Sequence, residues 1–93
     1  MPGVILSVRA QKSFKKRLKS GSFPKKKFDE VIDLLKAGID LPAKYVDHAL
    51  KGRLEGYREL HLEYDLLIQY AVEKGGSVIL IVALGTHSEL FGP

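Results

Sequence analysis

The chain of 93 residues contains no cysteine, which excludes disulfide bonds and thiolate metal sites. No stretch approaches the ~20 consecutive apolar residues of a membrane-spanning helix. The first six residues lack the positively charged start and the apolar segment of a secretory signal. We therefore expect residues 1–93 to form a single soluble, cytoplasmic domain that relies on one compact core and has no contact with a membrane.

Acidic residues are missing from the N-terminal third. Residues 1–28 contain nine Lys or Arg and no Asp or Glu, whereas residues 52–93 contain three Lys or Arg and six acids. A localised positive surface attracts polyanions, most often nucleic acid. A helix face whose lysines only keep the protein soluble would have the same composition, so charge alone supports both interpretations equally.

The chain begins with the pattern of a strand followed by a helix. Residues 4–8 are rich in β-branched side chains, which predicts a short strand. Residues 11–21 predict a helix, because Phe14 and Leu18 are four positions apart and share a face. Gly21 suits the C-terminal stop of that helix.

A second helix is predicted directly after the first, which makes the two a helical hairpin. Ser22 is the expected N-cap, with Pro24 in the first turn and Gly38 at the end. The apolar stripe at helical spacing consists of Phe28, Val31, Ile32 and Leu35.

The period of the sequence changes in the second half. Residues 40–54 are irregular, and residues 56–63 then alternate, as in a half-buried strand. Leu60 and Leu62 occupy the apolar face of this strand. The opposite face is polar and carries Tyr57, Glu59, His61 and Glu63.

Two further strands complete a predicted β-meander. Residues 66–72 return after a tight turn, and residues 74–76 have the composition of a hairpin turn. Residues 77–84 are almost wholly apolar, as expected of a strand covered on both faces. The fold class is therefore α+β: an N-terminal strand, a helical hairpin and an antiparallel β-meander, with the helices on one face of the sheet.

Three histidines and nearby acids form the candidate catalytic set. We expect His48 in a loop before the meander, His61 on the polar face of its first strand and His87 at the edge of the sheet. Asp65 is expected across the hairpin, within reach of His61, where a carboxylate orients the ring. RNA cleavage needs one group to take the 2′-OH proton and another to protonate the leaving 5′ oxygen. Scattered surface or capping histidines are the alternative.

A metal site is the competing use of three imidazoles. Zinc ligands usually occur as close pairs such as His-x-x-x-His. These histidines are 13 and 26 residues apart. The spacing therefore predicts neither a metal nor a cofactor.

The motifs of the C-terminal half resemble those of the YafQ branch of the RelE-like toxins, the toxin halves of bacterial type II toxin–antitoxin pairs. The resemblance extends over essentially the whole chain and implies the RelE-like microbial ribonuclease fold. The matching series are Asp47-His48-x-Leu50-x-Gly52, Gly56-Tyr57-Arg58-Glu59-x-His61, Asp65-x-x-x-x-Tyr70 and Gly85-Thr86-His87-Ser88-Glu89-Leu90-Phe91-Gly92.

This resemblance implies a ribosome-dependent endoribonuclease that cuts mRNA in the A site without a metal. It places the catalytic set on His48, His61, Asp65, His87 and Phe91. His87 would be the general acid, and Phe91 would hold or splay a base. Glu59 and Glu63 are weaker candidates for supporting charge. Tyr57 and Tyr64 could also stack bases, whereas Tyr70 is expected in the core.

Partners also follow from the resemblance. It implies a cognate antitoxin protein, which neutralises the toxin and binds operator DNA together with it, and contacts with mRNA and ribosomal RNA. Basic residues that could hold phosphates are Lys12, Lys15, Lys16, Arg17, Lys19, Lys25, Lys26, Lys27, Lys51 and Arg53.

One position departs from the family pattern. Two residues before the Gly of the Gly-Thr-His motif the family usually has Arg, and this chain has Ala83. A guanidinium there would stabilise the charge of the phosphorane, and loss of such a donor costs about 2.7–4 kcal/mol, a factor of ~10²–10³ in rate. We therefore expect an attenuated toxin, whether Ala83 is engineered or natural. The alternatives are an inactive antitoxin-binding module and a ParE-like toxin that does not cut RNA.

Overall fold

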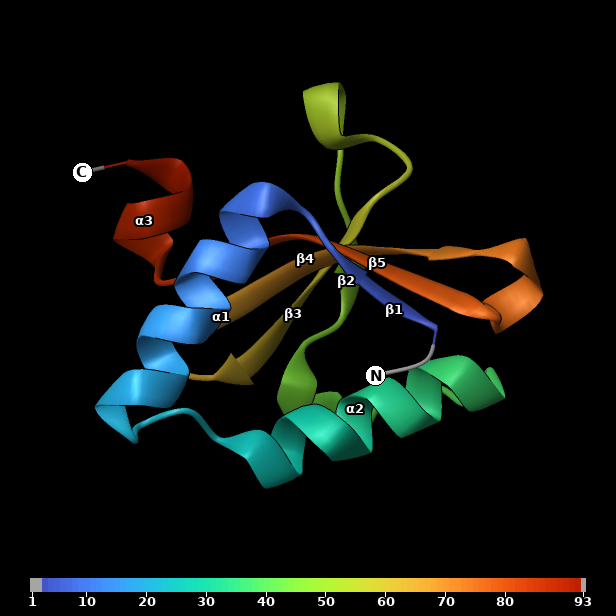
Figure 1. The fold of residues 1–93 in the computed structure, drawn as a ribbon. Helices are drawn as coiled ribbons and strands as arrows, with labels where there is room; N and C mark the ends of the chain where they lie inside the picture. The colour runs from blue at the N-terminus through green and yellow to red at the C-terminus, as the bar shows by residue number, and fades with distance from the viewer. Residues whose placement is uncertain (1–2, 93) are drawn as a thin grey trace.

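A computed structural model describes residues 3–92 and places five strands in one sheet in the order β1-β5-β4-β3-β2 (Figure 1). β1 runs parallel to β5, and all other neighbours are antiparallel. The predicted α+β fold of strand, two helices and meander is confirmed. The strands are β1 (Val4–Leu6), β2 (His48–Ala49), β3 (Arg58–Glu63), β4 (Leu66–Glu73) and β5 (Val78–Gly85).

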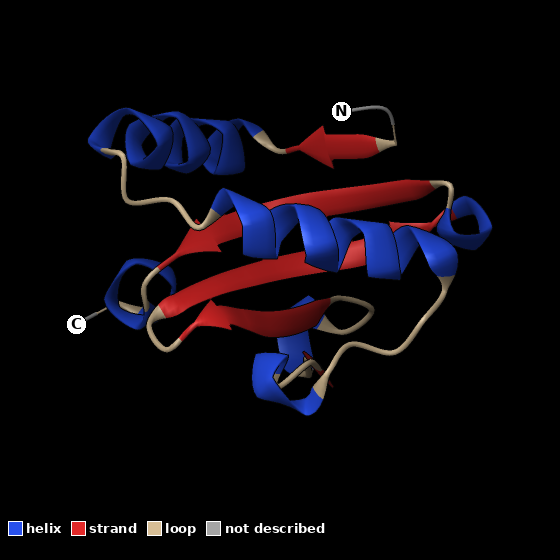
Figure 2. Ribbon diagram, turned by 90° about the horizontal axis from the view of Figure 1, so that it is seen from below, coloured by secondary structure: helices blue, strands red, loops and turns tan. Residues whose placement is uncertain are grey.

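The helices α1 (Val8–Ser20) and α2 (Lys25–Ala37) pack on one face of the sheet, and α2 lies across the strands in Figure 2. The two helices meet through the rings of Phe14, Phe23 and Phe28, whose centroids are 4.9–5.4 Å apart. Burial of a large apolar side chain contributes about 1.5–3 kcal/mol. The buried set on this face includes Val31, Ile32, Leu60, Leu62, Ile68, Tyr70, Ile79 and Ile81, which confirms the stripe of α2 and the core position of Tyr70.

α1 begins earlier than the apolar pattern predicts. The side chain of Ser7 accepts a hydrogen bond from the backbone N–H of Ala10 (3.0 Å) and caps the helix. Val8 is therefore the first residue of α1, and β1 ends at Leu6. The predicted strand over residues 4–8 is too long because a hydroxyl at Ser7 stops it.

The N-cap predicted at Ser22 is wrong. Pro24 occupies the N-cap of α2 without a side-chain cap, and the Ser22 hydroxyl pairs instead with that of Ser20 (2.7 Å). Gly21 and Gly38 end α1 and α2 in the left-handed conformation, as predicted.

Residues 40–54 contain more structure than their composition suggests. The segment forms the 3-10 helices η1 (Ala43–Tyr45) and η2 (Gly52–Leu54), with β2 between them. β2 pairs with β3 so that His48 lies opposite Glu59. His48 is thus in a strand at the edge of the sheet, and the predicted loop position is wrong. A two-residue strand has no period that a sequence could reveal.

A bulge in β5 decides which residues of that strand face the helices. Ile81 pairs with Tyr70 and Ala83 pairs with Gln69, so Val82 has no partner in the ladder between them. The hydroxyl of Ser7 donates to the carbonyl of Val82 (2.7 Å). Ile81 therefore points into the core, whereas Ala83 points to the opposite face with Gln69.

The turn at η3 (Lys74–Gly76) closes the hairpin between β4 and β5, as predicted. Among the described residues, no helix is long and apolar enough to cross a membrane.

Candidate active site

Three histidines gather on the face of the sheet that is opposite to α1 and α2. His48 from β2 and His61 from β3 have ring centroids 6.4 Å apart, and His61 and His87 have centroids 5.6 Å apart. His87 follows β5 as the first residue of the short helix α3 (His87–Phe91). The structure thus brings the three predicted histidines together on one face of the sheet.

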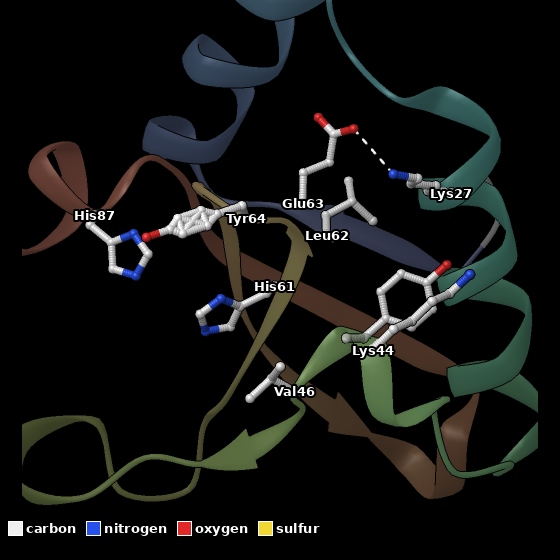
Figure 3. Close-up of a pocket in the computed structure, with 9 residues that line it drawn as sticks. Lys27, Lys44, Val46, His61, Leu62, Glu63, Tyr64 and His87 are labelled. Carbon is white, nitrogen blue, oxygen red and sulfur yellow. Dashed lines mark hydrogen bonds and ion pairs between the residues drawn. The ribbon is translucent and has the colours of Figure 1, made fainter.

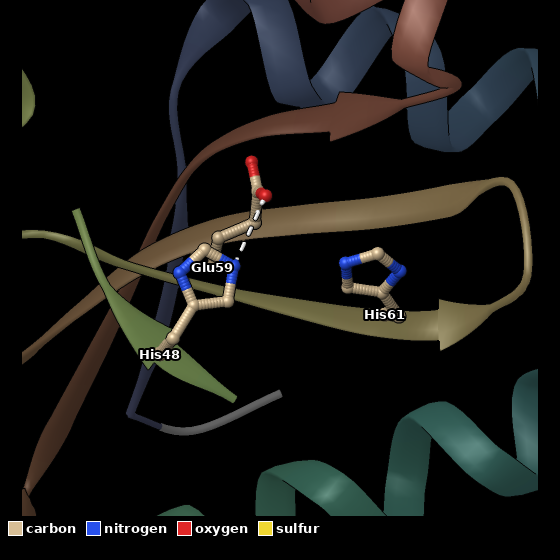
Figure 4. Close-up of side chains that lie close together, drawn as sticks. All are labelled: His48, Glu59 and His61. Carbon is tan, nitrogen blue, oxygen red and sulfur yellow. Dashed lines mark ion pairs between the residues drawn. The ribbon is translucent and has the colours of Figure 1, made fainter. Parts of the chain in front are cut away.

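A buried carboxylate lies behind His48. Glu59 is only 5% exposed, and its Oε1 lies 3.5 Å from Nε2 of His48. Figure 4 marks this contact with a dashed line. The other oxygen, Oε2, accepts a hydrogen bond of 3.0 Å from the side-chain amide of Gln69, which is also buried. A buried carboxylate is costly unless it is paired, so the imidazole and the amide both stabilise Glu59.

Gln69 was not predicted as a site residue, and Glu59 was predicted only as a weak one. The sequence does contain a signal for Gln69, because it is the single polar residue that interrupts the apolar run of β4. Because Glu59 and Gln69 are register partners in β3 and β4, their side chains leave the same face of the sheet. Strand register, which the sequence does not specify, makes this pair.

A second carboxylate lies against His87. Oδ1 of Asp65 is 2.6 Å from Nδ1 of His87 and accepts the backbone N–H of His87 at 2.9 Å. These two hydrogen bonds, the backbone bond first, lower the pKa of Asp65, so that its carboxylate stays ionised. Asp65 was expected to face His61; it faces His87 instead because it lies in the turn between β3 and β4, beside the end of β5.

A capping box holds His87 in place. The side chain of Thr86 accepts a hydrogen bond from the backbone N–H of Glu89 (3.2 Å), and the carboxylate of Glu89 accepts that of Thr86 (2.8 Å). Glu89 also pairs with the guanidinium of Arg17 from α1. The spacing of Thr86 and Glu89 is the signal that could have predicted α3, which the sequence interpretation missed.

The pH range of this arrangement follows from the two lowered carboxyl pKa values. The backbone N–H of Thr86 lowers the pKa of Glu89, and the backbone N–H of His87 lowers that of Asp65. An acid with a lowered pKa contributes stability above its unfolded pKa and loses it as the pH falls through the folded one. We expect α3 to stay docked from neutral pH down to about pH 4 and to detach only below it.

The measurement for this prediction is the pH dependence of the backbone amide signals of His87 and Glu89, recorded by NMR. Asp65→Asn removes one titrating carboxyl and should abolish the corresponding transition at low pH. A transition centred above pH 5 would contradict the expected direction.

His48 is anchored by its neighbour in the chain. The carboxylate of Asp47 accepts hydrogen bonds from the guanidinium of Arg58 (3.1 and 3.3 Å) and from the hydroxyl of Tyr70. Burial first, and then the contact with Asp47, raise the pKa of Tyr70, so the hydroxyl remains a donor. Arg58 and Tyr70 lie on β3 and β4, so this network ties the segment before His48 to the centre of the sheet.

Ala83 lies on the same face as the buried carboxylate. It is 2% exposed and pairs with Gln69, the residue that donates to Glu59. The position where the family pattern has Arg therefore adjoins Glu59 and the histidine face. In this chain Glu59 accepts a hydrogen bond from the neutral side-chain amide of Gln69, and no guanidinium from position 83 is available to it.

Three of these side chains could hold a metal ion. Ligand atoms of His48, Glu59 and His61 all lie within 4.8 Å of one another. Two imidazole nitrogens and a carboxylate oxygen are donors that suit zinc or copper(II). Spacing along the sequence did not indicate this set, because β2–β3 pairing and strand alternation bring the ligands together.

The remaining predicted site residues are dispersed. Phe91 is at the end of α3, 58% exposed, and has no ring contact with the histidines among the described residues. Arg17 pairs with Glu89, Lys25 with Asp29 and Lys27 with Glu63. The other basic residues predicted to hold phosphates make no ion pair within the described part of the chain; they are Lys12, Lys15, Lys16, Lys19, Lys26, Lys51 and Arg53.

A family model described as "Bacterial toxin of type II toxin-antitoxin system, YafQ" matches residues 6–92. The mRNA interferase toxin YafQ of Escherichia coli K12 is 37% identical over 59 residues, which is 63% of this chain. The match spans 62% of that relative's own length.

Solved structures agree with the fold. A metal-bound toxin from Helicobacter pylori superimposes with a TM-score of 0.84 at 40% identity, covering 98% of this chain and all of the other. YafQ in the DinJ–YafQ complex of E. coli gives a TM-score of 0.80 at 29% identity, with 99% and 100% of the two chains covered.

Proposed function

The chain belongs to the YafQ family of bacterial type II toxins, and from this premise we propose that it is an endoribonuclease that cuts mRNA in the ribosomal A site. The observation that carries the proposal is the pair of histidine–carboxylate contacts, His48–Glu59 and His87–Asp65, on either side of His61. Cleavage of RNA by acid–base chemistry needs two proton-transferring groups on opposite sides of one phosphate.

The groups that contact each histidine indicate its proposed role. Asp65 binds Nδ1 of His87, which leaves Nε2 free to donate a proton to the leaving 5′ oxygen. The buried carboxylate of Glu59 stabilises the imidazolium that forms when His48 takes the 2′-OH proton, as a carboxylate does for the histidine of a catalytic triad. His61 lies between the two and contacts the phosphate. Phe91, exposed on α3, holds a base.

Attenuation is part of the proposal. Without a guanidinium at position 83, the phosphorane loses one preorganised donor on this face of the sheet. The acid, the base and the central histidine remain, so the chain retains slow cleavage.

The partners that we propose are the ribosome and an antitoxin. The exposed lysines of α1 make no ion pair within the described part of the chain and can contact the phosphates of ribosomal RNA, which gives affinity without sequence selectivity. The YafQ of E. coli forms a complex with DinJ. We propose that a cognate antitoxin likewise neutralises this chain, and that operator DNA is bound only through that complex.

The test is mRNA cleavage on programmed ribosomes, with the cut mapped by primer extension. A cut within the A-site codon supports the proposal. Ribosome or antitoxin binding without any cut would favour the non-catalytic module, and inhibition of a topoisomerase without RNA cleavage would favour the ParE-like alternative.

Metal binding is a second candidate property of the same face. A structural relative was solved as a metal-bound toxin, and His48, Glu59 and His61 form a compatible set of ligands. We propose that zinc or copper(II) binds here and inhibits cleavage, because a ligated imidazole cannot accept a proton.

The prediction for metals is therefore inhibition. Added zinc should slow ribosomal mRNA cleavage at least tenfold at saturation, and a chelator selective for zinc over magnesium should restore the rate. Glu59→Gln should weaken zinc binding measured by calorimetry, whereas Glu63→Gln, on the same strand outside the ligand set, should leave it unchanged. Stimulation by zinc would contradict the assigned role of His48.

A further inference from the structure

A cavity of about 580 Å³ adjoins the histidines on the side of α2 and η1 (Figure 3). His61 and His87 form part of its wall, and Leu62 and Tyr45 also line it. Its volume is within the range of small-molecule sites, ~300–1,000 Å³. The roles assigned to His61 and His87 concern the phosphate and the leaving oxygen, and they leave the rest of this space without an assigned occupant.

The rim of this cavity is cationic on one side. The ammonium group of Lys44 lies 5.1 Å from the centroid of the Tyr45 ring, which holds it by a cation–π contact. Lys27, from α2, also lines the cavity and pairs with Glu63 at 3.2 Å. Because Glu63 is the acid that lines the cavity and Lys27 balances it, Lys44 supplies the uncompensated positive charge.

An exposed aromatic ring stands opposite these lysines. Tyr64 is 85% exposed and lies in the turn between β3 and β4. Its chain neighbour Asp65 is bound to His87, which fixes the turn relative to the proposed general acid. Figure 3 shows the ring of Tyr64 reaching toward His87. No packing requirement of the core accounts for an aromatic at so exposed a position.

We infer that this cavity is a subsite for the nucleotide on the 3′ side of the cut, with its base stacked on Tyr64 and its 3′ phosphate at Lys44. The inference rests on the proposed function, since it is His87 that places the leaving 5′ oxygen of this nucleotide at the mouth of the cavity. An apolar floor, an open aromatic face and an ammonium group with no ion pair among the described residues match a base followed by a phosphate. A stacking contact of this kind accepts any base.

The test is a double-mutant cycle that combines removal of the Tyr64 ring with removal of the base directly 3′ of the cut. Single-turnover cleavage is measured on ribosomes programmed with two mRNAs, one intact and one with an abasic site directly 3′ of the mapped cut. Loss of one base–aromatic stack costs about tenfold. The wild type should therefore cut the abasic mRNA about tenfold more slowly, whereas Tyr64→Ala should cut both mRNAs at the same reduced rate.

Tyr64→Phe is the matched control and should behave as the wild type, because it keeps the ring. Lys44→Gln should reduce the slope of the rate against salt concentration by about one ionic contact. If Tyr64→Ala slows the abasic mRNA by the same factor as the intact mRNA, relative to the wild type on each, or slows neither, the subsite is overturned while the nuclease stays in place. Absence of cleavage by the wild type on any programmed ribosome would overturn the proposed function, and the subsite with it.

Discussion

Replacing His87 with glutamine should abolish mRNA cleavage, with a rate loss of about 10²–10⁴-fold, the usual contribution of a positioned general acid. Glutamine can keep a hydrogen bond to Asp65, but it has no proton to give to the leaving 5′ oxygen. Single-turnover cleavage on programmed ribosomes measures the effect. Binding to the antitoxin and thermal melting should remain unchanged, because His87 is exposed at the start of α3.

A substrate with a better leaving group separates the role of an acid from that of a positioning residue. When sulfur replaces the 5′ oxygen at the cut, departure no longer needs protonation. The His87→Gln variant should then recover most of its lost rate, whereas His48→Gln, which removes the proposed base, should not. Cleavage of normal mRNA that is unaffected by His87→Gln would remove this residue from the mechanism.

Ala83→Arg is expected to raise the cleavage rate by about 10²–10³-fold, which corresponds to the roughly 2.7–4 kcal/mol that one preorganised donor contributes. The new side chain leaves β5 on the face of Gln69 and Glu59. There the guanidinium can pair with the carboxylate of Glu59 and reach the phosphate held between His61 and His87.

Ala83→Met is the matched control, since it has similar length and no charge. Both variants must replace a buried methyl group, so their melting temperatures report whether the sheet accommodates the longer side chain. If arginine and methionine change the rate alike, the missing charge is not the cause of attenuation. If neither variant nor the wild type cuts mRNA while all three bind ribosomes, the non-catalytic module becomes the better explanation.

Arg17 does not replace the guanidinium that position 83 lacks. Arg17, on α1, forms an ion pair with Glu89 of α3. It therefore stabilises the helix that carries His87. It contributes to lowering the pKa of Asp65 only as the last of several causes. A guanidinium at position 83 would instead lie among the histidines, where charge develops during cleavage.

Local chemistry and periodicity were sufficient for much of the fold. The stripe of α2, the glycine stops, the alternation of residues 56–63 and the apolar run of β5 each depend on neighbours within one helix turn or one strand. They therefore predicted the α+β order and put Leu60 and Leu62 in the core. The errors at Ser22 and near residue 11 concern helix starts: the hydroxyl of Ser7 caps α1, whereas α2 begins after Pro24 without a side-chain cap.

The sequence by itself determined which chemical groups this protein has: three imidazoles, a basic N-terminal third and an alanine in place of an arginine. Tertiary structure decided their partners. The bulge at Val82 set the face of Ala83, and the pairing of β3 with β4 placed Gln69 beside Glu59. The turn between β3 and β4 placed Asp65 in hydrogen-bond contact with His87 and not with His61. Such contacts depend on strand register, which the buried faces and the turns of the paired strands fix together, so the pattern of one strand alone does not contain it.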